Sequence, residues 1–400
     1  MKLKIETSVA KGKIEAPPSK SMAHRALICG ALSGSSYISN IAYSKDITAT
    51  LECLEKMGAV VEKGSDYVKI GGLDPFSVPE NVNVFCNESG STLRFLIPLC
   101  MLSGNRVTLS GSKRLFERPL SVYEKICEEQ SIVFEKKDES VSVCGVLKNC
   151  NYSVAGNISS QFITGLLLVL PMLPSDSTLT VEGKFESESY VDLTLEVMRE
   201  FGVNVEKQGS VFYIKGGQKY NSVDYTVEGD CSNAAFLDAF NYLGGCVEVG
   251  GIKNGTLQGD RVYADMYNGL KNGEKDFDLS DCPDLGPVMF AMASYFGGAK
   301  FTGTSRLRIK ESDRAACMAK ELSKFGVKVD VYEDSVIINE SVVSEPKELL
   351  CGHNDHRIVM ALALLCSVKG GVIEGTEAVS KSFPDFFEKI SFLGVKVNEV

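Results

Sequence analysis

The chain has 400 residues, a formal net charge of -10 and an isoelectric point near 5.1. This acidic balance argues against a protein that coats nucleic acid, but it does not exclude a small anionic ligand, whose binding depends on local charge. The length predicts about two domains. No apolar run reaches the roughly 20 residues that a membrane-spanning helix needs. We therefore expect neither a nucleic-acid partner nor a membrane segment.

The N-terminus and the cysteines favour a cytoplasmic location. Residues 1–6 contain no apolar core of signal-peptide length. The 13 cysteines form no C-x-x-C pair and none has a histidine at zinc-binding spacing. Several, such as Cys29, Cys100 and Cys366, lie in apolar runs, where a thiol acts as a small hydrophobic group. Reduced thiols and no bound metal are the expectation.

One pattern recurs six times along the chain. It consists of an almost wholly apolar helical stretch, a tight polar or glycine turn, and then an alternating strand. A helix that is apolar all round is buried on most sides. The six copies span residues 25–40, 93–110, 162–181, 234–249, 288–302 and 358–374.

A second pattern alternates with the first. It is an amphipathic helix that ends near a glycine and is followed by a V-x-V-like strand, as at Gly58, Gly202, Gly326 and Gly394. Glycine after a helix predicts a left-handed cap, and the amphipathic face predicts contact with water. Weaker copies end at Ser131 and Gly273.

The two patterns together predict an α/β (α+β) protein of six repeated units, with three units in each of two domains. A boundary near residues 225–230 divides the copies equally, and no Pro/Ser-rich linker marks it. The segment 270–280 is short and polar, which indicates that the fourth unit is abbreviated.

Cations stand at or near the starts of many of these helices. Ser, Thr, Asp and Asn at such places are explained by helix capping. Cations are not, because the helix dipole disfavours them there unless an anion lies between them and the free N–H groups. Eight cations at repeated positions in an acidic protein indicate a site for more than one anionic group. They are Lys20, Arg25, Arg94, Arg118, Lys310, Arg314, Arg357 and Lys381.

Acidic side chains lie close to these cations. In the run from Lys310 to Arg314, two cations about one helical turn apart flank Glu311, a candidate proton carrier. Asp284 starts a very apolar stretch and is either a helix cap or a carboxylate directed into a site. His356 either caps its helix or supports Arg357.

Common catalytic motifs are absent. The chain has no P-loop, no G-x-G-x-x-G after a strand, no H-E-x-x-H and no G-x-S-x-G. We therefore expect a reaction that needs no nicotinamide, no zinc and no other cofactor.

At the helix starts the sequence resembles the 3-phosphoshikimate 1-carboxyvinyltransferases, or 5-enolpyruvylshikimate-3-phosphate synthases, of the enolpyruvyl transferase family. The likeness covers nearly the whole chain, and its specificity comes from the order of many short motifs. These are SKSMAHRAL, ESGSTLRF, FERPL, SSQF, VEGDCSNAAF, QGD, PDLGP, RIKESDR, NDHRI and KSFPDFF.

The resemblance implies a fold of six βαβαββ units in two domains, with the active site in the cleft between them. It implies a first domain of residues 17–227, which carries most contacts to shikimate 3-phosphate. Residues 1–16 and 228–400 would form the second domain, with Asp284, Glu311 and much of the phosphoenolpyruvate site. A monomer is expected.

The resemblance also implies the reaction and its residues. The enolpyruvyl group of phosphoenolpyruvate would pass to the 5-hydroxyl of shikimate 3-phosphate by addition and elimination, releasing phosphate. Asp284 would be the base, Glu311 the proton donor, and Lys20 and Lys381 would assist. The expected contacts of shikimate 3-phosphate are Lys20, Ser21, Arg25, Ser159, Ser160, Gln161, Ser187, Tyr190, Asp284 and Lys310. Those of phosphoenolpyruvate are Lys20, Gly90, Arg118, Gln161, Arg314, Arg357 and Lys381.

Two positions depart from the family pattern, and two other readings stay open. Glu88 stands where many members have Asn, and Arg306 where some place a substrate-contacting Asn. The UDP-N-acetylglucosamine enolpyruvyl transferases are the nearest rival, but their reactive loop Cys and their Lys-Asn motif are not visible. A non-catalytic anion-binding relative is the other alternative, and the joint presence of Asp284, Glu311, Lys20 and Lys381 argues against it.

Overall fold

The computed structural model describes the whole chain, residues 1–400, and its contacts divide it into two compact units. The continuous unit is Pro18–Glu228. The split unit joins Met1–Pro17 to Gly229–Val400. None of the helices is long and apolar enough to cross a membrane.

Five of the six sheets have four strands in one arrangement. In each, the first and second strands are parallel. The third strand is antiparallel to the second, and the fourth is antiparallel to the third and lies at the edge of the sheet. In the continuous unit the strand orders are β14 (Asp224–Thr226), β3 (Ser36–Ser39), β5 (Tyr67–Gly71), β4 (Val60–Lys63); β6 (Val82–Phe85), β7 (Val107–Ser110), β9 (Ser140–Cys144), β8 (Val133–Lys137); and β10 (Asn151–Ala155), β11 (Ser177–Glu182), β13 (Val211–Ile214), β12 (Val205–Gln208).

The split unit repeats this arrangement twice and abbreviates it once. Its four-stranded sheets are β16 (Asp276–Asp278), β17 (Ala299–Thr302), β19 (Ser335–Ile338), β18 (Val329–Val331); and β20 (Leu350–Cys351), β21 (Gly371–Glu374), β1 (Lys2–Glu6), β22 (Lys396–Glu399). The remaining sheet has only β2 (Lys11–Glu15) parallel to β15 (Cys246–Gly250). The predicted α/β class with repeated units is therefore confirmed.

Each unit has three apolar helices that pack against one another. They are α1 (Lys20–Ala31), α3 (Gly90–Cys100) and α6 (Ser160–Val169) in the continuous unit, and α8 (Cys231–Tyr242), α10 (Gly286–Tyr295) and α12 (His356–Lys369) in the split unit. Every residue of α12 from His356 to Ser367 is buried. Because these helices have no polar face, they form the centre of each unit's hydrophobic core.

Amphipathic helices alternate with the apolar ones, as predicted. They are α2 (Lys45–Lys56), α5 (Ser121–Gln130), α7 (Glu188–Glu200), α9 (Tyr263–Lys271), α11 (Arg314–Lys324) and α13 (Phe386–Phe392). Shorter elements are α4 (Lys113–Glu117) and the 3₁₀ turns η1 (Pro75–Ser77), η2 (Leu170–Met172), η3 (Gly259–Val262), η4 (Pro283–Leu285), η5 (Ser305–Ile309) and η6 (Thr376–Lys381).

The residues after the amphipathic helices have the predicted left-handed conformation. The φ angle is +116° at Gly58, +81° at Gly202, +83° at Gly326 and +96° at Gly394. Ser131 takes the same role after α5 with a φ of +57°. A strand follows each of these turns, which confirms the helix-glycine-strand pattern.

The fourth repeat lacks its antiparallel hairpin. After α9 the chain turns at Gly273, with a φ of +89°, and enters β16 at Asp276. Strand β16 is the first strand of the next sheet, where it pairs with β17. The short polar segment 270–280 thus replaces two strands, which is why the sheet of β2 and β15 stops at two.

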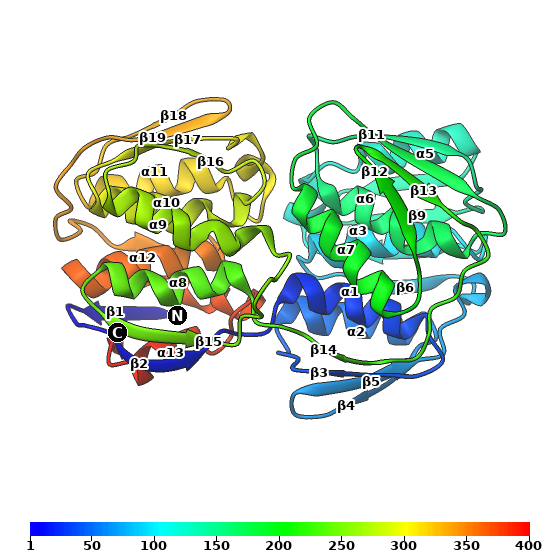
Figure 1. Ribbon diagram of the computed structural model, residues 1–400, viewed down its shortest axis with the longest axis horizontal. Helices are drawn as coiled ribbons and strands as arrows, with labels where there is room; N and C mark the ends of the chain where they lie inside the picture. Colours follow the sequence, from blue (N-terminus) through cyan, green and yellow to red (C-terminus); the bar gives the residue numbers. More distant parts are fainter. The chain divides into compact units, whose positions relative to one another are not determined.

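The N-terminal strand β1 lies inside the last sheet of the chain. It pairs antiparallel with β21, with Lys2 opposite Glu374, and with β22, with Leu3 opposite Glu399. Figure 1 shows β1, coloured blue, within the unit that holds the red C-terminal elements. Ile5 is fully buried in the core of the split unit. The first residues are therefore part of that unit's core.

Replacement of Ile5 by Ala tests this role of β1. Loss of a fully buried Ile side chain leaves a cavity, and we expect it to lower the free energy of unfolding by about 3 kcal/mol. Lys4→Ala, on the exposed face of the same strand, should change it by less than about 0.5 kcal/mol. Urea unfolding measures both. Equal small effects would show that β1 contributes little to the core.

Candidate functional site

Most predicted site residues lie at helix N-termini, where the local sequence provides side-chain caps. Ser19, Ser89, Ser159, Asp230 and Asp355 each accept a backbone N–H from the first turn of α1, α3, α6, α8 and α12. These helices begin where they do because their free N–H groups are satisfied by short polar side chains. The neighbouring cations are thereby held at fixed places relative to the helix ends.

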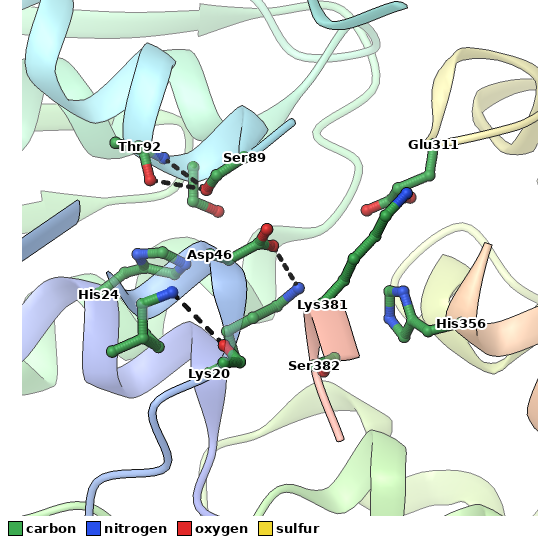
Figure 2. Close-up of polar contacts among 12 residues, drawn as sticks. Lys20, His24, Asp46, Ser89, Thr92, Glu311, His356, Lys381 and Ser382 are labelled. Atoms are coloured by element: carbon green, nitrogen blue, oxygen red, sulfur yellow. Dashed lines mark hydrogen bonds and ion pairs between the residues drawn. The ribbon is translucent and has the colours of Figure 1, made fainter. Parts of the chain in front are cut away.

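Lys20 is the first residue of α1 and forms an ion pair with Asp46, in the first turn of α2. The distance from Lys20 Nζ to Asp46 Oδ2 is 2.8 Å, and the two side chains are 16% and 10% exposed. Figure 2 shows this pair and also Ser89, whose hydroxyl accepts hydrogen bonds from the N–H and the hydroxyl of Thr92. Asp46 was not among the predicted site residues, because its motif suggested only a helix start.

Arg25 is almost fully buried and joins three helices. Its guanidinium donates to the carbonyls of Ser21 (2.6 Å) and Tyr190 (2.8 Å) and to the hydroxyls of Thr194 (2.8 Å) and Thr164 (3.3 Å). Burial lowers the pKa of Arg25 to about 10. The predicted residues Ser21, Arg25 and Tyr190 are thus brought together in the continuous unit.

Gly90 and Arg118 are in close contact. A Cβ atom built on Gly90 would lie 2.6 Å from Arg118 Nη1 and 2.7 Å from Nη2. Gly90 is the first residue of α3, so the guanidinium lies against the N-terminus of that helix. A cation and a helix N-terminus together favour an anion.

The start of α6 carries three predicted residues. Ser159 caps the helix, and Ser160 is buried beside it. Gln161 accepts a hydrogen bond from Arg94 Nη1 (2.8 Å) and donates one to Ser91 Oγ (3.0 Å). Arg94 was grouped with the anion-binding cations, but it is 2% exposed and orients Gln161.

Ser187 precedes α7 in a left-handed conformation, with a φ of +54°. Its side chain is buried and makes no capping hydrogen bond to the helix, while its carbonyl accepts the Tyr190 N–H at 3.2 Å. Ser187 and Tyr190 therefore form one turn, and Tyr190 links that turn to Arg25.

In the split unit, Asp284 is the partner of three cations. Its Oδ1 lies 2.9 Å from Arg314 Nη1 and 3.2 Å from Lys310 Nζ, and its Oδ2 lies 3.0 Å from Arg357 Nη2. Arg357 also donates to the Asp284 carbonyl at 3.1 Å. Of the two readings left open for Asp284, the helix cap is wrong, since α10 has no side-chain cap.

The cations determine the ionisation of Asp284. Burial by itself raises the pKa of this carboxyl, but Arg357, Lys310 and Arg314 outweigh burial and hold the pKa well below its ordinary value. Burial, opposed by Asp284, lowers the pKa of Lys310. Asp284 is therefore a carboxylate at neutral pH, and Lys310 gives up a proton more readily than an exposed lysine does.

Arg314 connects three carboxylates. Besides Asp284, it binds Glu311 through Nη2 at 2.7 Å and Asp355 through Nε at 2.9 Å. Ser312 donates to the same Asp355 oxygen at 3.1 Å. Burial opposes the charge of Arg314, but these acids raise the pKa of its guanidinium. Asp355, fully buried, was missed as a site residue because its position also fits a helix cap.

Arg357 and Lys381 complete the split-unit group. Arg357 Nη2 also donates to Ser232 Oγ at 2.9 Å, and Lys381 Nζ donates to the Asn354 carbonyl at 2.6 Å. His356 is buried and is not the cap of α12, because the Asp355 side chain accepts the Arg357 N–H there. Figure 2 shows Lys381 and His356 as side chains of this unit.

Other features bear on ligands. No group of three or more His, Cys, Asp or Glu side chains is arranged to hold a metal ion. All 13 cysteines are free thiols, and eight of them are buried. Of the two positions that depart from the family pattern, Arg306 is buried and donates to the Ser280 carbonyl, while Glu88 is half-buried in the turn before α3.

Comparison with known proteins identifies the family. The model of the EPSP synthase family (3-phosphoshikimate 1-carboxyvinyltransferase) matches residues 5–390. The chain belongs to the EPSP synthase family. It is 41% identical to the 3-phosphoshikimate 1-carboxyvinyltransferase of Clostridium kluyveri, over 99% of this chain and 98% of that protein. The enzyme of the same name from Clostridioides difficile is 38% identical over 99% and 98% of the two chains.

Solved structures show the same fold. An EPSP synthase from Acinetobacter baumannii superposes with a TM-score of 0.79 at 23% identity, and a second structure of that name gives 0.80 at 22%. Each covers 100% of both chains. At this level of identity the likeness supports the shared fold of the EPSP synthase family, and the sequence relatives support the membership.

Replacement of Asp284 by Asn tests the charge balance of the split unit. The variant leaves three cations without this partner, so we expect roughly 3 kcal/mol less stability at pH 7. Because the folded pKa of Asp284 lies below its unfolded value, the wild-type advantage is complete above that unfolded value and is lost as the pH falls. Urea unfolding should give a constant gap from pH 8 to 5 and a shrinking gap below about pH 4.

The matched control is Asp176→Asn, in an exposed ion pair with Lys215 in the continuous unit. It should leave the unfolding midpoint nearly unchanged. A variant at Asp284 that is as stable as wild type at pH 7 would contradict the charge balance described above.

Proposed function

We propose that this chain transfers the enolpyruvyl group of phosphoenolpyruvate to the 5-hydroxyl of shikimate 3-phosphate and releases phosphate. This is the activity of 3-phosphoshikimate 1-carboxyvinyltransferase in aromatic amino-acid biosynthesis, and the family match and the names of the relatives support it. Both substrates carry phosphate and carboxylate groups, so an acidic protein needs a local gathering of cations to bind them.

The proposed contacts of each substrate are the residues that the family motifs imply. Shikimate 3-phosphate binds to Lys20, Ser21, Arg25, Ser159, Ser160, Gln161, Ser187, Tyr190, Asp284 and Lys310. Phosphoenolpyruvate binds to Lys20, Gly90, Arg118, Gln161, Arg314, Arg357 and Lys381. The arginines suit this task because the guanidinium fork matches the oxygens of phosphate and carboxylate groups.

The observation that carries the proposal is the pairing of Asp284 with three cations. In the ligand-free protein these cations hold the pKa of Asp284 so low that it is a poor base. When substrate phosphate and carboxylate groups bind Lys310, Arg314 and Arg357, they neutralise the same cations, and the pKa of Asp284 rises. Proton abstraction is thereby coupled to substrate binding.

The addition needs two proton transfers, and the elimination needs the removal of one proton from carbon. Asp284 takes the proton of the 5-hydroxyl as the oxygen attacks the central carbon of phosphoenolpyruvate, and Glu311 donates a proton to the methylene carbon. Loss of phosphate and return of the methyl proton then give the product. Lys20 and Lys381 stabilise the negative charge of the tetrahedral intermediate.

Phosphate release from phosphoenolpyruvate tests the function directly. We expect release with shikimate 3-phosphate and none with UDP-N-acetylglucosamine as acceptor. Asp284→Asn should lower kcat by about 10²- to 10⁴-fold, because it removes the general base, while calorimetry still detects binding of shikimate 3-phosphate.

The outcomes separate the alternatives. Release with the UDP-sugar alone would favour the rival transferase activity, and release with neither acceptor would favour a non-catalytic anion-binding protein. Asp176→Asn makes the same chemical change at an exposed ion pair. This control variant should keep wild-type turnover. Near-normal turnover of Asp284→Asn would remove Asp284 from the mechanism.

The contact between Gly90 and Arg118 makes a second kinetic prediction. In Gly90→Ala the new methyl group would displace the Arg118 guanidinium, whose atoms lie 2.6–2.8 Å from it. Loss of one charge-assisted hydrogen bond should raise the KM for phosphoenolpyruvate about tenfold. The KM for shikimate 3-phosphate should change less than about twofold, and equal changes in both constants would contradict the assignment of Arg118.

A further inference from the structure

Helix α11 and the chain segment 349–355 contact each other along their lengths in the split unit. Of the residues that make these contacts, only Arg314 is a proposed substrate contact. At the far end, Lys324 Nζ donates to the Leu349 carbonyl at 2.8 Å. In the middle, Glu321 accepts the Cys351 N–H at 2.9 Å. At the near end, Arg314 binds Asp355. One face of α11 therefore aligns the whole segment.

Glu321 is the centre of this contact. It is fully buried, and its two carboxylate oxygens are shared between His353 and Lys324. The distance from Glu321 Oε1 to His353 Nε2 is 2.8 Å, and that from Oε2 to Lys324 Nζ is 2.8 Å. A buried carboxylate with two cationic partners holds those partners firmly, because leaving any of the three charges uncompensated is costly.

Both members of the Glu321–His353 pair are charged at neutral pH. Hydrogen bonds to Cys317 and to Glu321 raise the pKa of His353 to about 10. Burial opposes the charge of Glu321, but hydrogen bonds from His353 and Lys324 and from the Cys351 N–H lower the pKa of its carboxyl. The pair is therefore ionic, and it is 18% exposed at His353.

The segment that this pair holds has an unusual backbone. His353 and Asn354 follow each other with φ angles of +49° and +53°. The left-handed region costs most non-glycine residues roughly 1–2 kcal/mol, and asparagine less. Such a conformation persists only where surrounding contacts fix it, and the side chain of His353 supplies one of those contacts.

The backbone beyond His353 contacts the proposed site directly. The Asn354 carbonyl accepts a hydrogen bond from the Lys381 ammonium, and the Asp355 carboxylate accepts one from the Arg314 guanidinium. The direction of that carbonyl depends on the left-handed turn at His353 and Asn354. A change at His353 would thus reach Lys381 and Arg314 without either of them losing its side chain.

We propose that Glu321 and His353 are positioning residues, whose ion pair fixes the strained turn so that Lys381 and Arg314 are aligned for phosphoenolpyruvate. Neither residue is among the proposed substrate contacts, and the family motifs in the sequence assign a role to neither. The identity of the ligand rests on the proposed function, whereas the fixing of the turn does not.

His353→Asn tests the pair while it spares the backbone, because asparagine tolerates the left-handed region. We expect the KM for phosphoenolpyruvate to rise about fivefold to tenfold, since misplacement of binding groups weakens them by such factors. The KM for shikimate 3-phosphate should stay within about twofold. His353→Lys, which restores a cation opposite Glu321, should recover most of the loss.

Two further variants distinguish positioning from general stability. Lys324→Met removes the other cation on Glu321 but contacts only the Leu349 end of the segment. It should lower the thermal midpoint and leave both KM values within about twofold. The single variants Glu321→Gln and His353→Asn disrupt the same ion pair. The double variant should therefore raise the KM for phosphoenolpyruvate no more than the single variant with the larger effect does.

Amide hydrogen exchange of residues 350–357, read by mass spectrometry on the ligand-free protein, tests the turn without any substrate. Exchange should be faster in His353→Asn than in wild type and in Lys324→Met. If the wild-type protein showed no transferase activity, the proposed function would fail. Faster exchange in His353→Asn than in wild type would still support the role of the ion pair in fixing the turn. Unchanged exchange, or equal rises of both KM values in His353→Asn, would overturn the proposal.

Discussion

The charge balance around Asp284 is the constraint on which the split unit depends. One carboxylate compensates Lys310, Arg314 and Arg357, which come from separate loops and helices. Without it, the buried Arg314 and Arg357 and the half-buried Lys310 would repel one another in a low-dielectric environment. Under the proposed function, the same cations would bind the anionic groups of the substrates. One set of atoms would then serve both the ion pairs with Asp284 and substrate binding.

This balance explains why cations lie at helix starts, where the dipole disfavours them. Some of these cations have a carboxylate from another element: Lys20 has Asp46, and Arg314 has Asp355. The apolar helices that follow these cations are buried, as α12 shows from His356 to Ser367. Polar side chains can therefore gather only at the N-terminal ends of such helices. The helices supply rigidity, and the ion pairs offset the cost of the charges.

The sequence predicted the repeats, the two kinds of helix and the glycine turns, because these follow from periodicity over a few residues. It did not predict which acid neutralises which cation. Asp46 is 26 residues from Lys20, and Asp355 is 41 residues from Arg314. Pairings at that distance depend on tertiary packing. Both acids also stand where a helix start would require a polar residue, so the capping signal concealed them.

The place of β1 has a consequence for synthesis on the ribosome. Residues 2–6 complete their sheet only with β21 and β22, which emerge more than 360 residues later. At a translation rate of about 5–20 residues per second, the first strand waits roughly 20–70 seconds for its neighbours. The continuous unit has all its strands by residue 228. The continuous unit can therefore complete its sheets before β1 meets the strands that flank it.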